Sequence, residues 1–375
     1  MTQPVCRVLV TGAHGFIGKN LVVRLDELER FSVTTFVRGD DVATLPDLVA
    51  HADAVVHLAG ENRPQDENAF AAVNTRLTVA VCEAIRATGR KVPLVLASST
   101  QAERDNAYGR SKLAAEQAVQ ALGHAMGNPA VIFRLPGVFG KWCKPNYNSV
   151  VATFCHNIAR GLTIQIHNPA ESLSLVYVDD VITAMIAALD APLVGTTQGT
   201  VSPRYAITLG ELAEQIRALG NCRTTLLTER VGTGLARALY ATYVSYLPSE
   251  RFAYEVPQYA DPRGVFVEML KTPDSGQFSY FTAHPGVTRG GHYHHTKTEK
   301  FLVIKGQALF RFRHLLTNEL YELTTTGEQP QVVDTIPGWA HDITNVGEDE
   351  LVVMLWANEN FDRARPDTIA AKVTT

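Results

Sequence analysis

The sequence predicts an α/β domain with a parallel sheet, followed by an all-β domain. In the first part, short β-branched runs alternate with stretches of helical periodicity, which is typical of a doubly wound sheet. From Phe252 onward, short strand-like runs separated by glycine and proline turns dominate, which favours an antiparallel sandwich or barrel. The length of 375 residues also exceeds that of most single domains. We therefore expect one domain over residues 1–248 and a second over 249–375.

The composition is that of an ordinary folded protein, with 46% hydrophobic and 19% charged residues. The formal charge of −4, without any basic block, speaks against nucleic acid or an anionic membrane as a partner. The five cysteines are scattered and form no CxxC pair, which indicates reduced thiols. No apolar run approaches the ~20 residues of a membrane helix, and no signal peptide opens the chain. We expect a cytoplasmic protein.

The first strand, Arg7 to Val10, ends in the glycine-rich loop TGAHGFIG, and an amphipathic stretch follows. Strand, glycine turn and helix form the context that a phosphate-binding loop needs. Gly12 permits the tight turn, Gly15 lets the backbone approach a pyrophosphate, and Gly18 allows close helix–strand packing. The anion would then lie at the positive end of the helix. The residues expected to line this Rossmann-type dinucleotide site are Gly12, His14, Gly15, Phe16, Ile17 and Gly18.

The second and third strands predict further cofactor contacts. The second, Ser32 to Val37, ends at Arg38, whose guanidinium can pair with a ribose 2′-phosphate, so we expect NADPH rather than NADH. Asp40 and Asp41 follow closely, and a solvated turn arginine is the alternative. The third strand, Ala54 to Leu58, opens into small residues where the cofactor backbone would pass. The contacts expected from these strands are Arg38, Leu58, Ala59 and Gly60.

A tyrosine and a lysine four residues apart, Tyr108 and Lys112, follow the next strand, which ends in SST at residues 98–100. The pair opens a helical stretch, so both side chains share one helix face. The lysine would lower the pKa of the phenol and hold the nicotinamide ribose, and the tyrosine would protonate an alkoxide as hydride reaches a carbonyl carbon. A hydroxyl of Ser99 or Thr100 would hold the carbonyl oxygen. We predict Ser99, Tyr108 and Lys112 as catalytic, with Tyr108 and Lys112 also contacting the cofactor. The alternative is that the pair has no catalytic role, because a tyrosine and a lysine at this spacing are common on ordinary helix faces.

The all-β part carries a group of histidines. His292 and His294 are two residues apart, so on an extended strand both side chains point to one face. Glu299 follows after a short connection, and His341 can arrive from an opposing strand. Three nitrogens and a carboxylate suit zinc, iron, manganese or nickel. We predict a divalent-metal site at these four residues; the alternative is a barrel whose interior histidines are hydrogen-bonded without metal.

The motifs of both parts resemble known families. TGAHGFIG, HLAG, SST, YGRSK and RLPGVFG appear in the order found in the extended short-chain dehydrogenase/reductase family, whose members mostly act on nucleotide-activated sugars. That resemblance implies catalytic roles for Tyr108 and Lys112. The spacing from Gly286 through the two histidines and the glutamate to Gly306 resembles the first motif of the cupin family, and PGWAHDITN resembles its second. The resemblance to the cupin family implies a jelly-roll barrel.

The two parts in this order resemble the CapF-type bifunctional enzymes of capsule and O-antigen biosynthesis, over essentially the whole chain. The resemblance implies that the cupin half epimerises carbon 3 of UDP-2-acetamido-2,6-dideoxy-L-arabino-4-hexulose. The reductase half then reduces carbon 4 with NADPH, giving UDP-2-acetamido-2,6-dideoxy-L-talose on the path to UDP-N-acetyl-L-fucosamine. It further implies a homodimer and a zinc ion held by His292, His294, Glu299 and His341.

The sequence is also compatible with two other functions. The cupin half could be a structural, dimerising module attached to a plain 4-ketoreductase, or the first half could be a non-enzymatic dinucleotide sensor. The intact SST and YGRSK motifs speak against the sensor. The epimerase base is also open among Tyr293, His295, Lys297 and Lys300. The metal could act as a Lewis acid or only hold the pocket, and four protein ligands favour the structural role.

Overall fold

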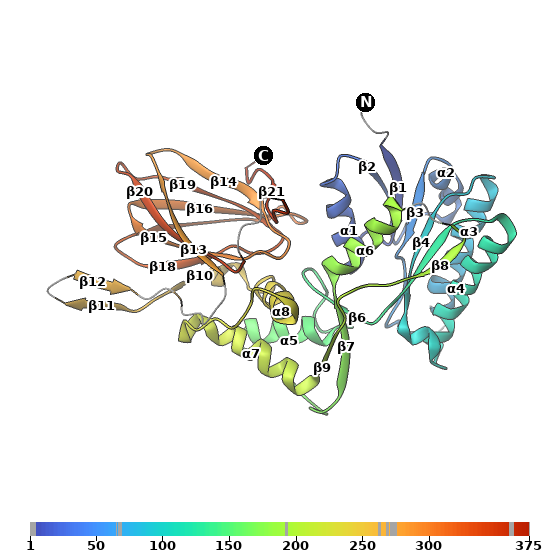
Figure 1. Cartoon of the computed structure of the whole chain (residues 1–375), viewed down its shortest axis with the longest axis horizontal. Coiled ribbons are helices and arrows are strands. Elements are labelled where there is room, and N and C mark those ends of the chain that lie inside the picture. The colour runs from blue at the N-terminus through green and yellow to red at the C-terminus, as the bar shows by residue number, and fades with distance from the viewer. Residues whose placement is uncertain are drawn as a thin grey trace. The chain divides into compact units, whose positions relative to one another are not determined.

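The computed structural model describes residues 5–64, 66, 70–191, 194–261, 264–267, 270, 276–359 and 364–374 (Figure 1). The chain divides into two compact units, Met1–Ser149 with Leu173–Ile207, and Val150–Ser172 with Thr208–Thr375. The domains predicted above, 1–248 and 249–375, follow the change from helices to strands and stay a prediction. The compact units have other bounds because three helices before residue 248 pack on one another and fall in the same unit as the strands that follow them.

The first unit is built on a six-stranded parallel sheet in the order β2-β1-β3-β4-β5-β8. Its strands are β1 (Cys6–Thr11), β2 (Phe31–Phe36), β3 (Ala54–His57), β4 (Leu94–Ser99), β5 (Ala130–Leu135) and β8 (Thr196–Gly199). Its helices are α1 (Phe16–Asp26), α2 (Leu45–Ala50), α3 (Leu77–Ala87), α4 (Ala107–Met126) and α6 (Val178–Asp190), with short helical segments at Val42–Thr44, Phe70–Arg76 and Thr100–Glu103. A small sheet adds β6 (Gly137–Phe139), β7 (Ser172–Tyr177) and β9 (Tyr205–Thr208).

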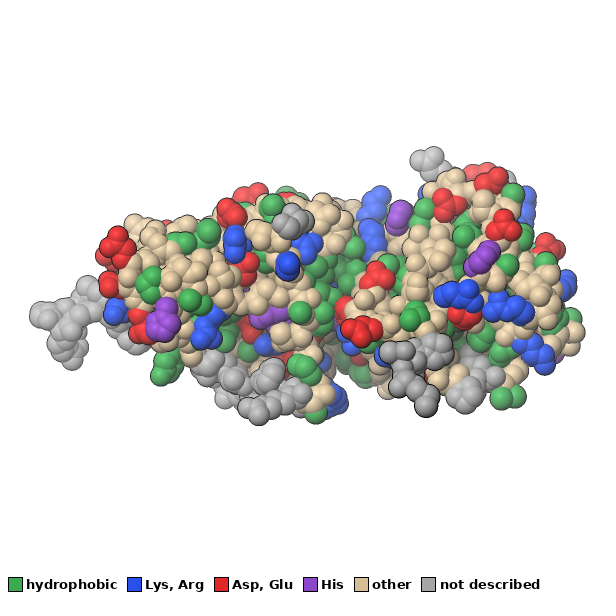
Figure 2. All heavy atoms as spheres, turned by 90° about the horizontal axis from the view of Figure 1, so that it is seen from above, with side chains coloured by type: hydrophobic (Ala, Val, Ile, Leu, Met, Phe, Trp, Pro, Cys, Tyr) green, Lys and Arg blue, Asp and Glu red, His purple; other side chains and the backbone are tan. Residues whose placement is uncertain are grey.

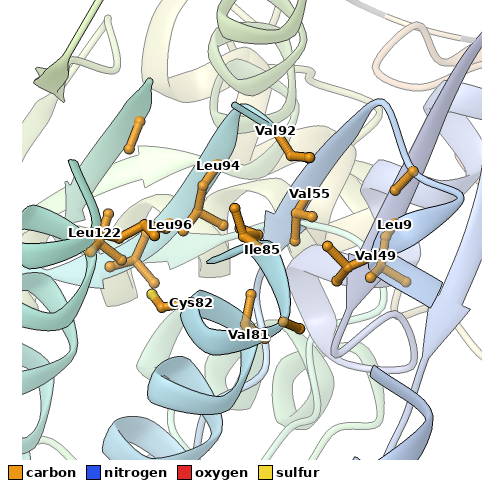
Figure 3. Close-up of a cluster of buried hydrophobic side chains, with 14 of the residues drawn as sticks. Leu9, Val49, Val55, Val81, Cys82, Ile85, Val92, Leu94, Leu96 and Leu122 are labelled. Atoms are coloured by element: carbon orange, nitrogen blue, oxygen red, sulfur yellow. The ribbon is translucent and has the colours of Figure 1, made fainter. Parts of the chain in front are cut away.

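A buried apolar cluster holds one face of this sheet against α2, α3 and α4 (Figure 3). Strands β3 and β4 are buried along their whole length, as expected for parallel strands covered on both faces. Helix α3 contributes Val81 and Ile85, which lie one turn apart on its inner face. Each such fully buried side chain stabilises the unit by about 1.5–3 kcal/mol. The packing fixes the carboxyl ends of the strands at one edge, where the residues predicted for the dinucleotide site and for catalysis lie.

The second unit begins with helices. They are α5 (Val150–Ala159), α7 (Leu209–Thr225), α8 (Gly234–Val244) and a short turn at Ser249–Arg251. Helix α7 is capped by Thr208, whose hydroxyl accepts from the Glu211 amide while the Glu211 carboxylate accepts from the Thr208 amide. Helix α8 was not predicted, because its tyrosine-rich sequence lacks a clear polar face, and most of its residues are buried.

The rest of this unit is all-β. Two five-stranded sheets run in the orders β10-β18-β15-β20-β13 and β17-β16-β19-β14-β21, with antiparallel pairing throughout the described ladders. Their inner faces meet, since the ring centroids of Phe301 and Phe310, one from each sheet, lie 6.0 Å apart. The strands are β10 (Ala253–Glu255), β13 (Gln277–Ala283), β14 (Thr288–Tyr293), β15 (Glu299–Lys305), β16 (Gln307–His314), β17 (Leu320–Thr326), β18 (Gln331–Asp334), β19 (Trp339–Asn345), β20 (Leu351–Ala357), β21 (Ile369–Ala370) and a separate hairpin of β11 (Gln258–Asp261) and β12 (Gly264–Val267).

The predicted class, an α/β unit with a parallel sheet followed by all-β sheets, is confirmed. The closer assignment to a cupin barrel stays a prediction. Among the described helices, none combines the length and the apolar character that crossing a bilayer requires. On the face drawn in Figure 2, acidic and basic side chains are interspersed, in keeping with the small formal charge of −4.

Candidate functional site

The glycine loop joins β1 to α1 in the way predicted. Gly12 has φ +70, and a Cβ there would lie 2.6 Å from the Ala59 amide nitrogen, so only glycine fits. Gly15 is the N-cap of α1 and has no side chain to occupy the helix end. A Cβ on Gly18 would lie 2.2 Å from the Gly12 carbonyl oxygen. The backbone is therefore left open at a helix amino end, which is the arrangement that binds a pyrophosphate.

The other predicted cofactor residues lie around this loop. His14 is exposed, and Phe16 and Ile17 are half-buried in the first turn of α1. Leu58, Ala59 and Gly60 follow β3, and the Ala59 amide donates to the Thr11 hydroxyl at 3.3 Å. The carboxyl ends of β1 and β3 are thus tied together beneath the glycine loop.

Arg38 follows β2 with an exposed guanidinium, which lies 2.6 Å from one oxygen of Glu61. The Tyr147 hydroxyl donates to the other Glu61 oxygen at 2.8 Å. Burial would raise the pKa of the Glu61 carboxyl, but these two partners outweigh it and the pKa is lowered. The arginine expected to meet a 2′-phosphate is therefore held by a carboxylate in this structure.

The predicted catalytic residues converge at the end of β4 and the start of α4. The Ser99 hydroxyl is hydrogen-bonded to the Tyr108 phenol. The Lys112 ammonium is buried, donates to the Ala97 carbonyl at 3.2 Å and lies 6.0 Å from the centre of the Tyr108 ring. A Cβ on Gly60 would lie 3.1 Å from the Lys112 nitrogen, so the lysine reaches the predicted cofactor contact. Serine, tyrosine and lysine are thus arranged for proton transfer beside the dinucleotide loop.

The net pKa shift of the Tyr108 phenol in this structure is upward, whereas a lowering was predicted. Burial raises the pKa of the Tyr108 phenol, and the hydrogen bond with Ser99 opposes that rise only in part. Burial also lowers the pKa of Lys112 to about 8. The phenol therefore keeps its proton near neutral pH, which is the form that a general acid needs.

Asn74 and Glu61 were not predicted as parts of the site. The Asn74 side chain is buried, accepts from the Glu61 amide at 2.8 Å and donates to the Ser111 hydroxyl at 3.0 Å. It thereby fixes the segment after Gly60 against α4, next to Lys112. No motif or spacing in the surrounding sequence, FAAVNTRLTVA, marks Asn74 as a site residue.

In the all-β part, the four predicted metal ligands come together. One possible ligand atom from each of His292, His294, Glu299 and His341 lies within 4.8 Å of the others. Nε2 of His294 is 3.0 Å from Oε2 of Glu299, and Nε2 of His341 is 3.7 Å from that oxygen. The residues come from β14, the segment after it, β15 and β19, so three strands and one loop build the cluster.

The predicted path of the backbone through this cluster needs a correction. Strand β14 ends at Tyr293, so His294 lies beyond it, and the pairing with β19 shifts between Gly290 and His292. Gly290 and Gly291 have φ of +102 and +71, values that break the simple alternation of side chains along a strand. The rings of His292 and His294 nevertheless lie 5.0 Å apart.

The ionisation of these groups fits a divalent metal. Burial lowers the pKa of His292 to about 4 and that of His341 well below its usual value, so both rings are neutral near pH 7. Burial would raise the pKa of the Glu299 carboxyl, but the hydrogen bond with His294 and the ammonium of Lys297 outweigh burial, so the pKa is lowered. Within the described part of the chain, neither ring nitrogen of His341 has a hydrogen-bond partner. Neutral imidazoles with a carboxylate are the forms that bind zinc or a similar ion.

The two oxygens of Glu299 face different partners. Lys297 Nζ lies 2.7 Å from Oε1, while Oε2 faces the histidines. The Glu299 amide donates to the Thr335 hydroxyl at 2.8 Å, which holds the start of β15 in place. One carboxylate oxygen is therefore free of the lysine and directed into the histidine cluster.

Two family models match the chain in tandem. That of the NAD dependent epimerase/dehydratase family matches residues 8–202, and that of the polysaccharide biosynthesis C-terminal domain matches residues 259–369. A crystal structure of the capsular polysaccharide assembling protein CapF from Staphylococcus aureus is 37% identical and covers 98% of this chain and 100% of that one, with a TM-score of 0.64. This chain belongs to the CapF-type family. The CapF match spans both units, so the order of the two parts is a property of the family.

Two further comparisons concern the whole chain and its first part. A Pseudomonas aeruginosa protein named UDP-2-acetamido-2,6-beta-L-arabino-hexul-4-ose reductase is 57% identical over 98% of this chain and 99% of its own length. A structure of the Bordetella bronchiseptica enzyme WbmF in complex with NADH is 22% identical and covers 58% of this chain and 78% of that one, with a TM-score of 0.51. The second likeness shows a shared fold for the first part of this CapF-type chain.

Proposed function

We propose that this CapF-type protein is a bifunctional nucleotide-sugar enzyme. Its all-β part epimerises carbon 3 of UDP-2-acetamido-2,6-dideoxy-L-arabino-4-hexulose, and its α/β part then reduces carbon 4 with NADPH. The product is UDP-2-acetamido-2,6-dideoxy-L-talose, an intermediate for UDP-N-acetyl-L-fucosamine in capsule or O-antigen synthesis. The observation that carries the proposal is the coexistence of a Ser99–Tyr108–Lys112 site, in which the serine and the lysine are buried, and a separate three-histidine, one-glutamate cluster. The name of the P. aeruginosa relative, a UDP-2-acetamido-2,6-beta-L-arabino-hexul-4-ose reductase, supports this choice of substrate.

In the reductase step, Tyr108 acts as the general acid. Bound NADPH supplies the hydride to carbon 4, and the developing alkoxide takes the phenolic proton of Tyr108. The hydroxyl of Ser99, already hydrogen-bonded to the phenol, holds the same oxygen. The buried ammonium of Lys112 stabilises the phenolate left behind, because an opposite charge nearby favours the ionised form.

In the epimerisation step, the all-β part exchanges the proton on carbon 3. The neighbouring ketone acidifies this proton, so a base can remove it and return it on the other face. A divalent metal held by the histidine cluster would supply positive charge to the enolate oxygen or keep the pocket rigid. Epimerisation is reversible, and the reduction that consumes NADPH gives the pair a direction. We further expect a cytoplasmic homodimer that binds neither nucleic acid nor membrane.

The decisive experiment is incubation of the protein with the 4-keto UDP-sugar and NADPH, with the product followed by NMR. The proposal predicts a sugar that is inverted at carbon 3 and reduced at carbon 4. Reduction without inversion would support a plain ketoreductase with a structural all-β module. Absence of both reactions, with the dinucleotide bound, would support a sensor.

A further inference from the structure

The carboxyl-terminal segment lies against the strand that carries the first metal ligand. Strand β21 (Ile369–Ala370) pairs with β14 at His292 and Tyr293, and the Ala371 amide donates to the Gly291 carbonyl at 2.8 Å. The Val373 side chain is buried, and Arg313 of β16 donates to the Lys372 carbonyl. The end of the described chain is therefore part of the sheet that builds the histidine cluster.

Just before β21, the Asp367 carboxylate holds the loop between β14 and β15. Its Oδ1 accepts from the His295 amide at 2.9 Å, and its Oδ2 accepts from the Thr296 and Lys297 amides, each at 2.7 Å. The Thr296 hydroxyl adds a fourth bond at 3.0 Å. Three successive amides thus enclose one carboxylate, which holds the loop in the conformation seen here.

The same residue also fixes a ligand directly. The Asp367 main-chain oxygen can only accept a hydrogen bond, so Nδ1 of His294, which contacts it, carries the proton. Nε2, which lies 3.0 Å from Oε2 of Glu299, is then the nitrogen at which a metal ion would replace a proton. A partner of this kind sets the tautomer and the orientation of a metal-binding imidazole.

We propose that Asp367 is a positioning residue for the metal centre, acting on His294 through its main chain and on the 295–297 loop through its carboxylate. The inference rests on the metal site of the proposed function. The loop spans the four residues between His294 and Glu299, and Asp367 accepts from the amides of the first three. Asp367 thus constrains the connection between the two ligands from 70 residues further along the chain.

The test is Asp367→Asn, which keeps the shape of the side chain but turns an amide group toward backbone donors. Zinc affinity is measured by competition with a chromogenic chelator, and the ligand geometry by the visible spectrum of the cobalt(II)-loaded protein. We expect D367N to bind zinc about 10–100-fold more weakly, the usual effect of losing an outer partner of a ligand. Its cobalt spectrum should change in shape and intensity.

Two variants serve as controls. Asp53→Asn removes a carboxylate that pairs with Arg7 in the other unit, so it tests for a general loss of stability and should leave zinc binding unchanged. Asp367→Glu keeps the charge but displaces it by one methylene, and its affinity should fall between wild type and D367N. If D367N does not fold, D367E decides in its place.

A folded D367N, or D367E in its place, with wild-type zinc affinity and an unchanged cobalt spectrum overturns the inference. So does an equal loss of zinc affinity in D53N, because the effect would then be one of stability. A wild-type protein that binds neither zinc nor cobalt overturns the metal centre itself. That result is distinct, because it would be visible before any variant is made.

Discussion

At the scale of single residues, Lys112 is a charged group in a buried position. Burial lowers its pKa from 10.5 to about 8. At pH 7 the side chain is still charged, so its desolvation destabilises the folded state. Between these two pKa values the unfolded chain binds more protons than the folded one, and stability rises with pH. Replacing Lys112 by a neutral residue should therefore raise the free energy of unfolding most at a pH below 8.

We therefore expect Lys112→Met to raise the free energy of unfolding of the α/β unit at pH 7 by about 1–3 kcal/mol. The gain should shrink as the pH approaches 10.5, while reductase activity is lost at every pH. Urea denaturation at pH 7 and near pH 10.5 measures this change in unfolding free energy, and Lys91→Met at an exposed lysine is the control. A less stable K112M at pH 7 would show that the lysine's bond to Ala97 outweighs desolvation.

A second prediction at this scale concerns the metal. His292→Ala removes one of four clustered ligands, so zinc bound after dialysis should fall well below one equivalent. Elemental analysis of the purified protein measures it, and the exposed His284→Ala is the matched control. H292A with full zinc content would mean that this residue is a bystander.

The site residues differ in how far the sequence revealed them. Tyr108, Lys112 and the metal ligands carry fixed spacings, so the motifs alone brought them forward. Asn74 and Asp367 act through hydrogen bonds to backbone far away in the chain, and no local spacing marks such contacts. The direction of the Tyr108 pKa shift was mispredicted because burial, which raises this pKa, cannot be read from a spacing.

At the scale of elements, the parallel strands were predictable because buried β-branched runs end in turns of small residues. Helix α8 and the end of β14 were not, since their boundaries depend on tertiary packing and on glycines with positive φ. The compact units likewise group α5, α7 and α8 with the strands, a division that depends on packing rather than on local sequence.

The glycine loop gives an element-scale prediction. In Gly18→Ala, the new methyl would meet the Gly12 oxygen at 2.2 Å and the Ala13 Cα at 2.8 Å, so α1 must shift away from the loop. We expect NADPH affinity to fall at least about tenfold and the unit to lose about 1–3 kcal/mol of stability. Titration calorimetry and thermal melting measure these effects. Gly232→Ala, whose methyl would be 3.4 Å from its nearest neighbour, is the control, and wild-type affinity in G18A would contradict the role of the loop.

At the scale of the whole molecule, one chain carries two sites of different chemistry. The α/β unit holds the Ser99–Tyr108–Lys112 group and the glycine loop, and the all-β sheets hold four residues whose chemistry suits a divalent ion. The family match covers both parts at once. The central claim of the proposal is therefore a division of labour, in which each half acts on the same ketone and can be silenced without the other.

Tyr108→Phe tests that claim most directly. The variant keeps the ring and its packing but lacks the proton that the alkoxide needs, so NADPH oxidation should fall at least about 100-fold. In deuterated water, NMR should still show deuterium entering carbon 3 of the 4-keto UDP-sugar at the wild-type rate, above a control without enzyme. A folded Y108F in which this exchange also disappears would contradict the division of labour.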